Sequence, residues 1–407
     1  MGKVEAVTVN KPMKDGSFWG ICLGHTFTHW YSASFYILLP YMTLELGLSA
    51  AQAGSLVTAM FLFKTATGIP IGAITDMMRR KNLILALSLI LAGIPFFFMG
   101  LTDAYLILMM LVIIMGIGNE MWHPASFAIL AARFPEQRGF VFGFHGMAAN
   151  LGDLLAPVVI GGLIAMMAWQ DVVYWNVLPG LIVSVIILWL LRHVDFGHKQ
   201  TGQEGNMNFS EYVNGFKELF KNKIVLLLAL ASGFRSMAQT GLMTFLPLYL
   251  AIEMGISPLW VGIYVSILQG GGLLSAPIVG AISDKHGERK VVYSGMVLTS
   301  VMVLVMTLVR VNLLMIVTVA LIGFFLYALR PVMHAWAMNT TSDDMAGTTT
   351  SLVFTTQSLM ATVAPFIGGL LADQFGYIST FYFIAAVILI GNLVVFLIPK
   401  QDHELAK

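Results

Sequence analysis

Gly-Ala-Ile-Thr-Asp at 72–76 recurs as Gly-Ala-Ile-Ser-Asp at 280–284, an offset of 208 positions (280 − 72). The same offset relates further identical residues on both sides of this stretch. They are Glu45 and Glu253, Gly47 and Gly255, Gly54 and Gly262, Gly139 and Gly347, Ala156-Pro157 and Ala364-Pro365, and Gly161 and Gly369. Because one offset relates them all, the chain is predicted to contain two copies of one structural unit.

The composition places these copies in a membrane. Of the 407 residues, 58% are hydrophobic and 11% are charged, whereas soluble domains carry about 25% charged residues. The net charge of +1 offers no basic face for nucleic acid. The single cysteine, Cys22, excludes a disulfide within one chain and any multi-cysteine metal site.

Twelve apolar stretches are long enough to cross a hydrocarbon core as helices, which takes about 20 residues each. They are 17–41, 51–75, 82–101, 104–132, 139–167, 172–191, 224–252, 259–283, 291–310, 312–338, 347–373 and 378–399. A polar segment, 192–223, separates the first six from the last six. The sequence therefore predicts an all-α integral membrane protein with a bundle at 1–191, a linker at 192–223 and a bundle at 224–407.

Lysine and arginine residues orient the helices. With the N-terminus in the cytoplasm, almost all basic residues outside the spans fall on the cytoplasmic side, and the opposite side holds only Arg310. Both termini and the linker are then cytoplasmic, in the cell (inner) membrane. The first and seventh helices begin on the same side, so the two repeats are parallel rather than inverted.

The two copies resemble the signature of the major facilitator superfamily between its second and third helices. The first copy is Gly72-Ala-Ile-Thr-Asp76-Met-Met-Arg79-Arg80-Lys81, and the second runs from Gly280 through Asp284 to Arg289-Lys290. Met78 departs from the family's usual glycine, which the second copy keeps as Gly287. The resemblance covers essentially the whole chain. It implies a twelve-helix transporter whose helices 1, 4, 7 and 10 line a central cavity.

A second likeness lies in the fourth helix. The run Gly116-Ile-Gly118-Asn-Glu-Met-Trp-His123-Pro124 resembles the fosmidomycin-resistance branch of drug exporters, which also tends to have a histidine in helix 1, as His25 could be. Ala156-Pro157 and Ala364-Pro365, each followed by paired glycines, predict breaks in the fifth and eleventh helices. They resemble the proline-glycine motif that antiporters carry in helix 5, with Ala156 in place of a glycine and one residue inserted. Ordinary enrichment of these residues in membrane helices is the alternative explanation.

The signature motif predicts a gate. Gly72 would let its helix pack closely against a neighbour. Asp76 could accept hydrogen bonds from a helix N-terminus and pair with Arg79 or Arg80, with Asp284 and Arg289 as the second copy. Such a latch would hold the cytoplasmic side shut in one state. The alternative is that these arginines serve topology alone.

Ionisable residues within the spans mark the predicted site, because they cost at least about 2.5 kcal/mol each at the centre of a span. The predicted substrate-binding residues are His25, His29, Lys64, His123, Arg235, Gln239, Arg330 and His334. The predicted proton-coupling residues are Glu120 and Asp153, and the histidines are alternative proton carriers. His25 and His29 lie four apart, and thus on one helix face.

This set holds more fixed positive than negative charge, which favours an anionic solute clamped by arginine. The alternative is that Lys64–Glu120 and Arg235–Asp153 are structural ion pairs. The pair His25 and His29 could instead bind a metal. We assign no metal and no cofactor, because cysteine ligands are absent and cations crowd the same cavity.

The sequence therefore predicts a proton-coupled secondary active transporter, similar to drug-efflux proteins, that moves a small amphipathic or anionic organic solute across the membrane by alternating access. The alternatives are uptake of a small organic anion and transport of a metal chelate or a lipid-like molecule. No nucleotide-binding loop of Walker type is present, and no enzymatic activity is predicted. The expected partners are the solute, protons and the lipid bilayer, and the protein is expected to be a monomer.

Overall fold

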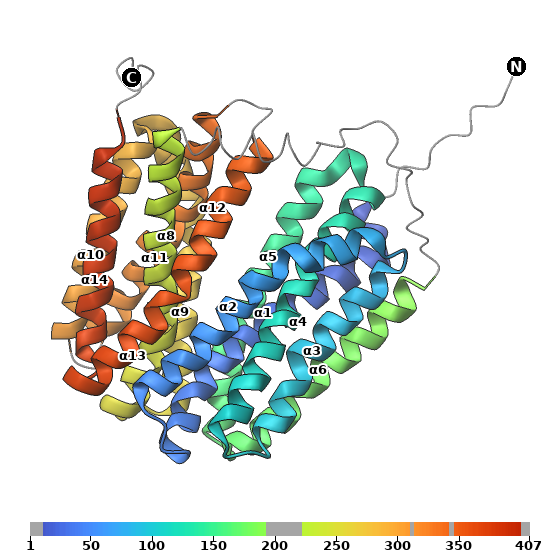
Figure 1. Ribbon diagram of the computed structural model, residues 1–407, viewed down its shortest axis with the longest axis horizontal. Helices are drawn as coiled ribbons and strands as arrows, with labels where there is room; N and C mark the ends of the chain where they lie inside the picture. The colour runs from blue at the N-terminus through green and yellow to red at the C-terminus, as the bar shows by residue number, and fades with distance from the viewer. Residues whose placement is uncertain (1–10, 193–221, 310–312, 342–345, 400–407) are drawn as a thin grey trace, which may run out of the picture. The chain divides into compact units, whose positions relative to one another are not determined.

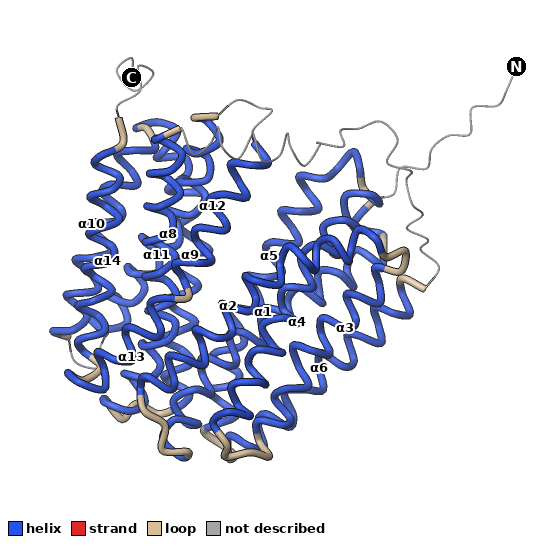
Figure 2. The backbone as a smooth tube through the Cα atoms, viewed as in Figure 1, coloured by secondary structure: helices blue, strands red, loops and turns tan. Residues whose placement is uncertain are grey.

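A computed structural model describes residues 11–192, 222–309, 313–341 and 346–399, and every regular element in these ranges is helical (Figure 2). The first half contains α1 (Gly16–Glu45), α2 (Ala50–Met77), α3 (Lys81–Met99), α4 (Tyr105–Arg133), α5 (Arg138–Ile164) and α6 (Trp169–Leu190). The second contains α8 (Lys223–Leu248), α9 (Pro258–His286), α10 (Glu288–Leu308), α11 (Leu313–Asn339), α12 (Ala346–Ala361), α13 (Val363–Phe375) and α14 (Ile378–Leu397). A π-helical turn, Tyr249–Glu253, extends α8.

The helices follow the predicted spans closely. Eleven helical stretches in the described ranges are long and apolar enough to cross a membrane, and one of them, Thr348–Phe375, combines most of α12 with α13. The predicted first span, α1, is not among them, although its 30 residues suffice in length. Its two histidines and its threonines and serines lower its hydropathy. The predicted linker, apart from its ends, and both chain termini lie outside the described residues.

The two predicted proline-glycine breaks have different outcomes. In the eleventh span the helix is interrupted at Thr362, between α12 and α13. Pro365 lacks the N–H that would bond to the carbonyl of Ala361, where α12 ends. In the fifth span α5 runs uninterrupted through Pro157, so a break in that helix was wrongly predicted.

The described chain divides into two compact units whose limits do not coincide with the repeat boundary. The first comprises the described residues up to Ala33, the range Ala66–Asp153 and the described residues from Gln170 to 192. The second comprises Ser34–Thr65, Leu154–Trp169 and the described residues from 222 onward. Parts of α1, α2 and α5 thus pack with the second half of the chain. The division into two six-helix bundles remains a prediction.

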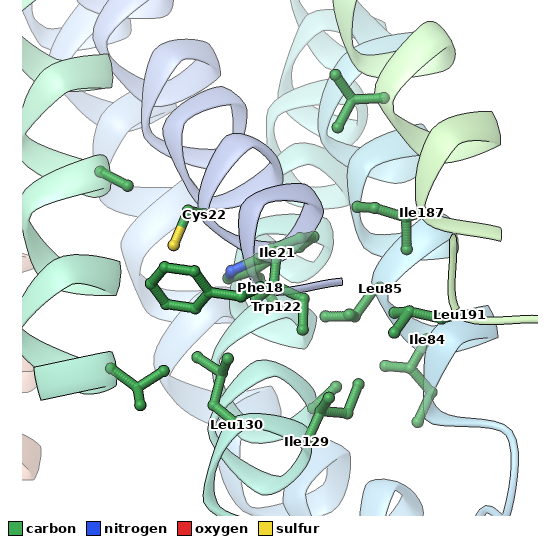
Figure 3. Close-up of a cluster of buried hydrophobic side chains, with 14 of the residues drawn as sticks. Phe18, Ile21, Cys22, Ile84, Leu85, Trp122, Ile129, Leu130, Ile187 and Leu191 are labelled. Carbon is green, nitrogen blue, oxygen red and sulfur yellow. The ribbon is translucent and has the colours of Figure 1, made fainter. Parts of the chain in front are cut away.

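The first unit has an apolar core to which α1, α3, α4, α5 and α6 contribute. Phe18, Ile21 and Cys22 of α1 pack with Trp122 of α4, and all four are buried (Figure 3). Gly24 is required beneath this tryptophan, because a Cβ there would lie 2.1 Å from the indole ring.

A polar contact fixes one end of the same unit. The Asp15 carboxylate accepts a hydrogen bond from the backbone N–H of Ser17, at 2.8 Å, at the start of α1. Its other oxygen pairs with Arg133 Nε, at 2.6 Å, at the end of α4. One carboxylate therefore caps α1 and ties it to α4.

The second unit contains the helices of the C-terminal half, which lie side by side in Figure 1. There α11 packs against α9 and α10, while α8 packs against α12 and α14. The polar residues of α8 and α11 described below are held by these neighbours.

The predicted topology can be tested at two exposed loop positions. Asp103, between α3 and α4, is predicted outside the cytoplasm, and Glu136, between α4 and α5, inside it. We expect Asp103→Cys to react with a membrane-impermeant maleimide in intact cells, and Glu136→Cys to react only after permeabilisation. The native Cys22 is 3% exposed and should give little background. Labelling of Glu136→Cys in intact cells would contradict the orientation.

Candidate functional site

Four histidines from α1, α4 and α5 meet inside the first unit. The His25 ring stacks on that of His145, with centroids 3.8 Å apart. The rings of His29 and His123 lie edge-on to His25, with centroids at 4.9 and 5.4 Å. The predicted shared face of His25 and His29 is therefore confirmed, and His123 joins them from the neighbouring helix.

Polar contacts set the orientation of three of these rings. His25 Nδ1 donates to the carbonyl oxygen of His145, at 2.7 Å, which leaves His25 Nε2 as the acceptor nitrogen of a neutral ring. His29 Nδ1 lies 2.9 Å from Asp153 Oδ2. Trp122 Nε1 donates to His145 Nε2, at 3.3 Å. Asp153 is thus paired with a histidine in this structure, and not left alone at membrane depth.

Glu120 lies three residues before His123 on α4 and is partly buried. Its Oε1 lies 3.2 Å from the position that a Cβ would take at Gly68 of α2. A glycine at 68 therefore leaves room for this carboxylate. Lys64, one turn earlier on α2, is partly buried and belongs to the second unit.

A second polar group lies on α8. Arg235 is 2% exposed, and its Nη1 donates to Gln239 Oε1, one turn away, at 2.8 Å. Its Nε has no hydrogen-bond partner in the described ranges. The predicted neighbours Arg235 and Gln239 are therefore in contact, and the buried guanidinium is bonded to a neutral amide.

Arg330 and His334 of α11 share an aromatic partner. The Arg330 guanidinium lies over the Phe354 ring, 5.8 Å from its centroid, and the His334 ring lies 4.6 Å from the same ring. His334 Nε2 is also 3.3 Å from the amide nitrogen of Gln357, a buried residue of α12. Cations, an aromatic face and amides thus line this part of the second unit.

The repeated glycines bring helix backbones together in symmetric pairs. A Cβ at Gly54 would lie 1.9 Å from the carbonyl oxygen of Pro365, and one at Gly262 would lie 2.1 Å from that of Pro157. These two contacts are related by the offset of 208 found in the sequence. We call them the α2/α13 crossing and the α5/α9 crossing.

Polar side chains repeat the same symmetry within the second unit. Thr58 donates its hydroxyl to the Thr362 carbonyl at 2.8 Å, and Ser266 donates to the Leu154 carbonyl at 2.7 Å. Each pair is carried onto the other by the same offset.

The contacts of two glutamates near the crossings are related by the same offset. Glu45 Oε2 accepts from Trp169 Nε1 at 2.9 Å, and Glu253 Oε2 accepts from the Tyr377 N–H at 3.2 Å. The internal repeat is therefore visible as repeated contacts, at the ends of the helices that the topology places outside the cytoplasm.

Comparison with known proteins identifies the family. Residues 21–280 and 228–407 match the profile described as Major Facilitator Superfamily. The chain belongs to the Major Facilitator Superfamily. Its fold agrees with this: a bacterial homologue of the human lysosomal transporter Spinster superposes with a TM-score of 0.79 at 17% identity, covering 94% of this chain and 96% of that one. The predicted fold class is confirmed.

Curated relatives of this superfamily member are distant. A putative metabolite transport protein of Haemophilus influenzae is 24% identical over 62% of this chain, which spans 63% of that relative's length. A phosphoglycerate transporter protein of Salmonella typhimurium is 22% identical, covering 95% of this chain and 89% of the relative. A multidrug resistance protein of Escherichia coli, MdtG, is 24% identical and covers 88% of both. As predicted, this is a family of transporters and not of enzymes.

The superfamily signature is not engaged in this structure. Asp76, Arg79 and Arg80 are exposed, and their side chains make no hydrogen bond or ion pair with any other described residue. Lys81 instead donates to the carbonyls of Thr75 and Met78 and so caps the end of α2. Close packing at Gly72 was wrongly predicted, since a Cβ there would meet nothing within 4 Å.

The second copy of the signature differs from the first. Arg289 Nη2 donates to the carbonyl of Phe396 at the end of α14, at 2.9 Å, while Asp284 is exposed. This arginine therefore caps a helix C-terminus in the described state.

The sequence interpretation missed three contributors to the sites: His145, Phe354 and Gln357. His145 was left out of the predicted site, although its carbonyl positions His25. Gln357 lies in the polar run Thr355-Thr-Gln-Ser358 of an apolar span, which is a usable signal. The contact of Phe354 with a distant cation has no signal in the sequence.

The crossings predict which glycines tolerate a methyl group. Gly54→Ala and Gly262→Ala force a side chain against a backbone carbonyl, so each should destabilise this state by about 1–3 kcal/mol. We expect a lower melting temperature for both in detergent. Gly72→Ala and Gly280→Ala are matched controls, because nothing lies within 4 Å of either added Cβ. Equal melting temperatures for all four variants would contradict the crossings.

Proposed function

We propose that this chain is a secondary active transporter that carries a small anionic or amphipathic organic solute by alternating access. The observation that carries the proposal is Arg235. Its guanidinium is buried, and its described hydrogen bond goes to the neutral amide of Gln239. A buried cation is stabilised best by an anion that can accept two parallel N–H bonds, as a carboxylate, phosphate or phosphonate does.

Neighbouring groups suit the same cargo. Arg330 lies within electrostatic range of Arg235, so the two cations act on one region. Phe354 and His334 provide ring faces for the apolar part of an amphipathic solute. We therefore assign the anionic group of the solute to the arginines and its apolar part to the aromatic side.

Export is the direction that we favour. The Escherichia coli relative is named as a multidrug resistance protein, and the motif in α4 resembles the fosmidomycin-resistance branch. The Salmonella relative is named as a phosphoglycerate transporter, which supports uptake of a small organic anion as the second candidate. Both names agree with an anionic or amphipathic cargo.

We assign the closing contacts of the two alternating states to opposite ends of the helices. The two crossings hold the predicted outer ends together, and Asp76 with Arg79 and Arg80 is the proposed cytoplasmic latch of the other state. A latch that is open while the crossings are closed is the arrangement that alternating access requires. We place the protein in the cell membrane as a monomer, with both termini in the cytoplasm.

Growth inhibition tests the proposed cargo. Cells that overproduce the protein are challenged with a panel of anionic and cationic antibiotics, with and without a proton uncoupler. We expect resistance to anionic or phosphonate compounds, lost with the uncoupler and lost in Arg235→Gln. Arg192→Gln is the control, because Arg192 lies at the end of the first bundle beside Trp189. Resistance confined to cationic compounds, or retained in Arg235→Gln, would contradict the anion site.

Proton coupling is assigned first to Glu120. It lies in the middle of α4, and a carboxylate at that depth cannot stay charged cheaply in both open states. Asp153, the second predicted candidate, is bonded to His29, and Glu120 also has an interaction partner. His25 and His29 are the remaining alternatives.

Amide variants separate these candidates. Glu120→Gln should abolish gradient-driven accumulation in proteoliposomes yet leave downhill exchange, because exchange needs no net proton movement. Asp153→Asn is the matched comparison and should retain at least part of the accumulation. If accumulation persists in Glu120→Gln and disappears in Asp153→Asn, the coupling residue is Asp153. If both variants and the two histidine variants accumulate solute, the coupling assignment is wrong.

A further inference from the structure

Three histidines of the first unit bring ring nitrogens together. One nitrogen each from His25, His29 and His123 lie within 4.8 Å of one another. Two come from successive turns of α1, and the third comes from α4. From the sequence, a metal was considered for His25 and His29 and none was assigned, because cysteine ligands are absent and cations crowd the same cavity.

His25 is oriented as a metal ligand. Its Nδ1–H is held by the carbonyl of His145, so the lone pair of Nε2 is directed away from that bond. Nε2 is buried and has no hydrogen-bond partner in the described ranges, in a residue that is 4% exposed. A buried acceptor left unbonded is costly and calls for a ligand.

His29 has the corresponding support from a carboxylate. Its Nδ1 lies 2.9 Å from Asp153 Oδ2, which leaves Nε2 for another partner. Histidines that bind metals usually donate their other ring nitrogen to a carboxylate or a backbone carbonyl, which fixes the ring and raises its basicity. The cluster contains both arrangements side by side.

We propose that His25, His29 and His123 bind one divalent transition-metal ion of the Zn²⁺ class. Imidazole nitrogens suit this class, whereas Mg²⁺ and Ca²⁺ prefer oxygen ligands. Zinc–nitrogen bonds of about 2.0–2.1 Å place tetrahedral ligands roughly 3.3 Å apart, so side-chain rotation must close the present spacing. Asp153 would supply negative charge beside the ion, because its carboxylate is bonded to the ligand His29.

Three protein ligands leave the fourth position of a tetrahedral ion open. Water or an oxygen of an anionic solute would take that position. Binding of this ion is separate from the proposed function, because it can be measured at equilibrium without any transport of solute. It stands or fails independently of the arginine site, which lies in the other unit.

Cobalt titration tests the site directly. Full-length protein, purified without a histidine tag and treated with a chelator, is titrated with Co²⁺ and followed by visible absorption. We expect about one equivalent to bind with a spectrum of low coordination number, and Zn²⁺ to displace it. Absence of such a spectrum in the wild type, or about one equivalent bound only through oxygen ligands, would overturn the proposal.

Variants locate the site. His25→Ala, His29→Ala and His123→Ala should each weaken Co²⁺ binding at least tenfold, and Asp153→Asn should weaken it about 10–100-fold through its support of His29. His334→Ala and His286→Ala are controls and should bind as the wild type does. Gel filtration and melting temperature report folding. For an alanine variant that fails to fold, the glutamine variant is used instead. Wild-type affinity in the folded triad variants, or equal losses in the controls, would overturn the assignment.

Discussion

Polar groups inside a hydrocarbon layer must find their partners within the protein, and this constraint shapes both candidate sites. In the first unit His25 bonds to a backbone carbonyl, His29 to Asp153 and Trp122 to His145. Among the described residues, these bonds leave His25 Nε2 and His145 Nδ1 without a hydrogen-bond partner. In the second unit Arg235 is satisfied only in part, by Gln239. His25 Nε2 and Arg235 Nε are the unsatisfied atoms to which we assign ligands.

Close approach of backbones is the second requirement, and the internal repeat meets it twice. Gly54 and Gly262 each admit the carbonyl of a proline from the facing helix. The symmetry of the internal repeat is incomplete beside these two crossings. The Asp373 carboxylate accepts from the N–H groups of Ala50 and Ala51 at 2.7 and 3.0 Å, whereas the repeat places Pro258, which has no N–H, opposite Ala165. The α2/α13 crossing thus carries a charge-assisted cap that the α5/α9 crossing lacks.

Much of the fold followed from composition and repetition, because a span needs only length and hydropathy and a repeat needs only one offset. The partners of individual side chains could be predicted less well from the sequence. The pairing of His25 with His29 was predictable, since four residues make one helical turn. The pairing of Asp153 with His29 was not, since it depends on how α1 meets α5. Within their own units Arg235 bonds to Gln239 and Asp153 to His29, and the ion pair between them that was weighed as an alternative stays a prediction.

The contacts of the signature motif were also not predicted by its sequence. Its glycine predicted close packing and its aspartate predicted a latch, yet a Cβ at Gly72 would meet nothing within 4 Å, and the exposed side chain of Asp76 has no partner in the described ranges. A motif that acts in one state of a two-state cycle gives no contact in the other. The glycines of the crossings, which the sequence showed only as part of the repeat, form the contacts of this state.

Alternating access through the α2/α13 crossing is the central claim, and a reversible cross-link tests it most directly. Ala51→Cys and Asp373→Cys, in a chain with Cys22→Ala, place two thiols where a carboxylate now meets a helix N-terminus. After reaction with a short reducible cross-linker, solute flux in proteoliposomes should stop and should return on reduction, with each single-cysteine variant unaffected. Undiminished flux in fully cross-linked protein would contradict the account.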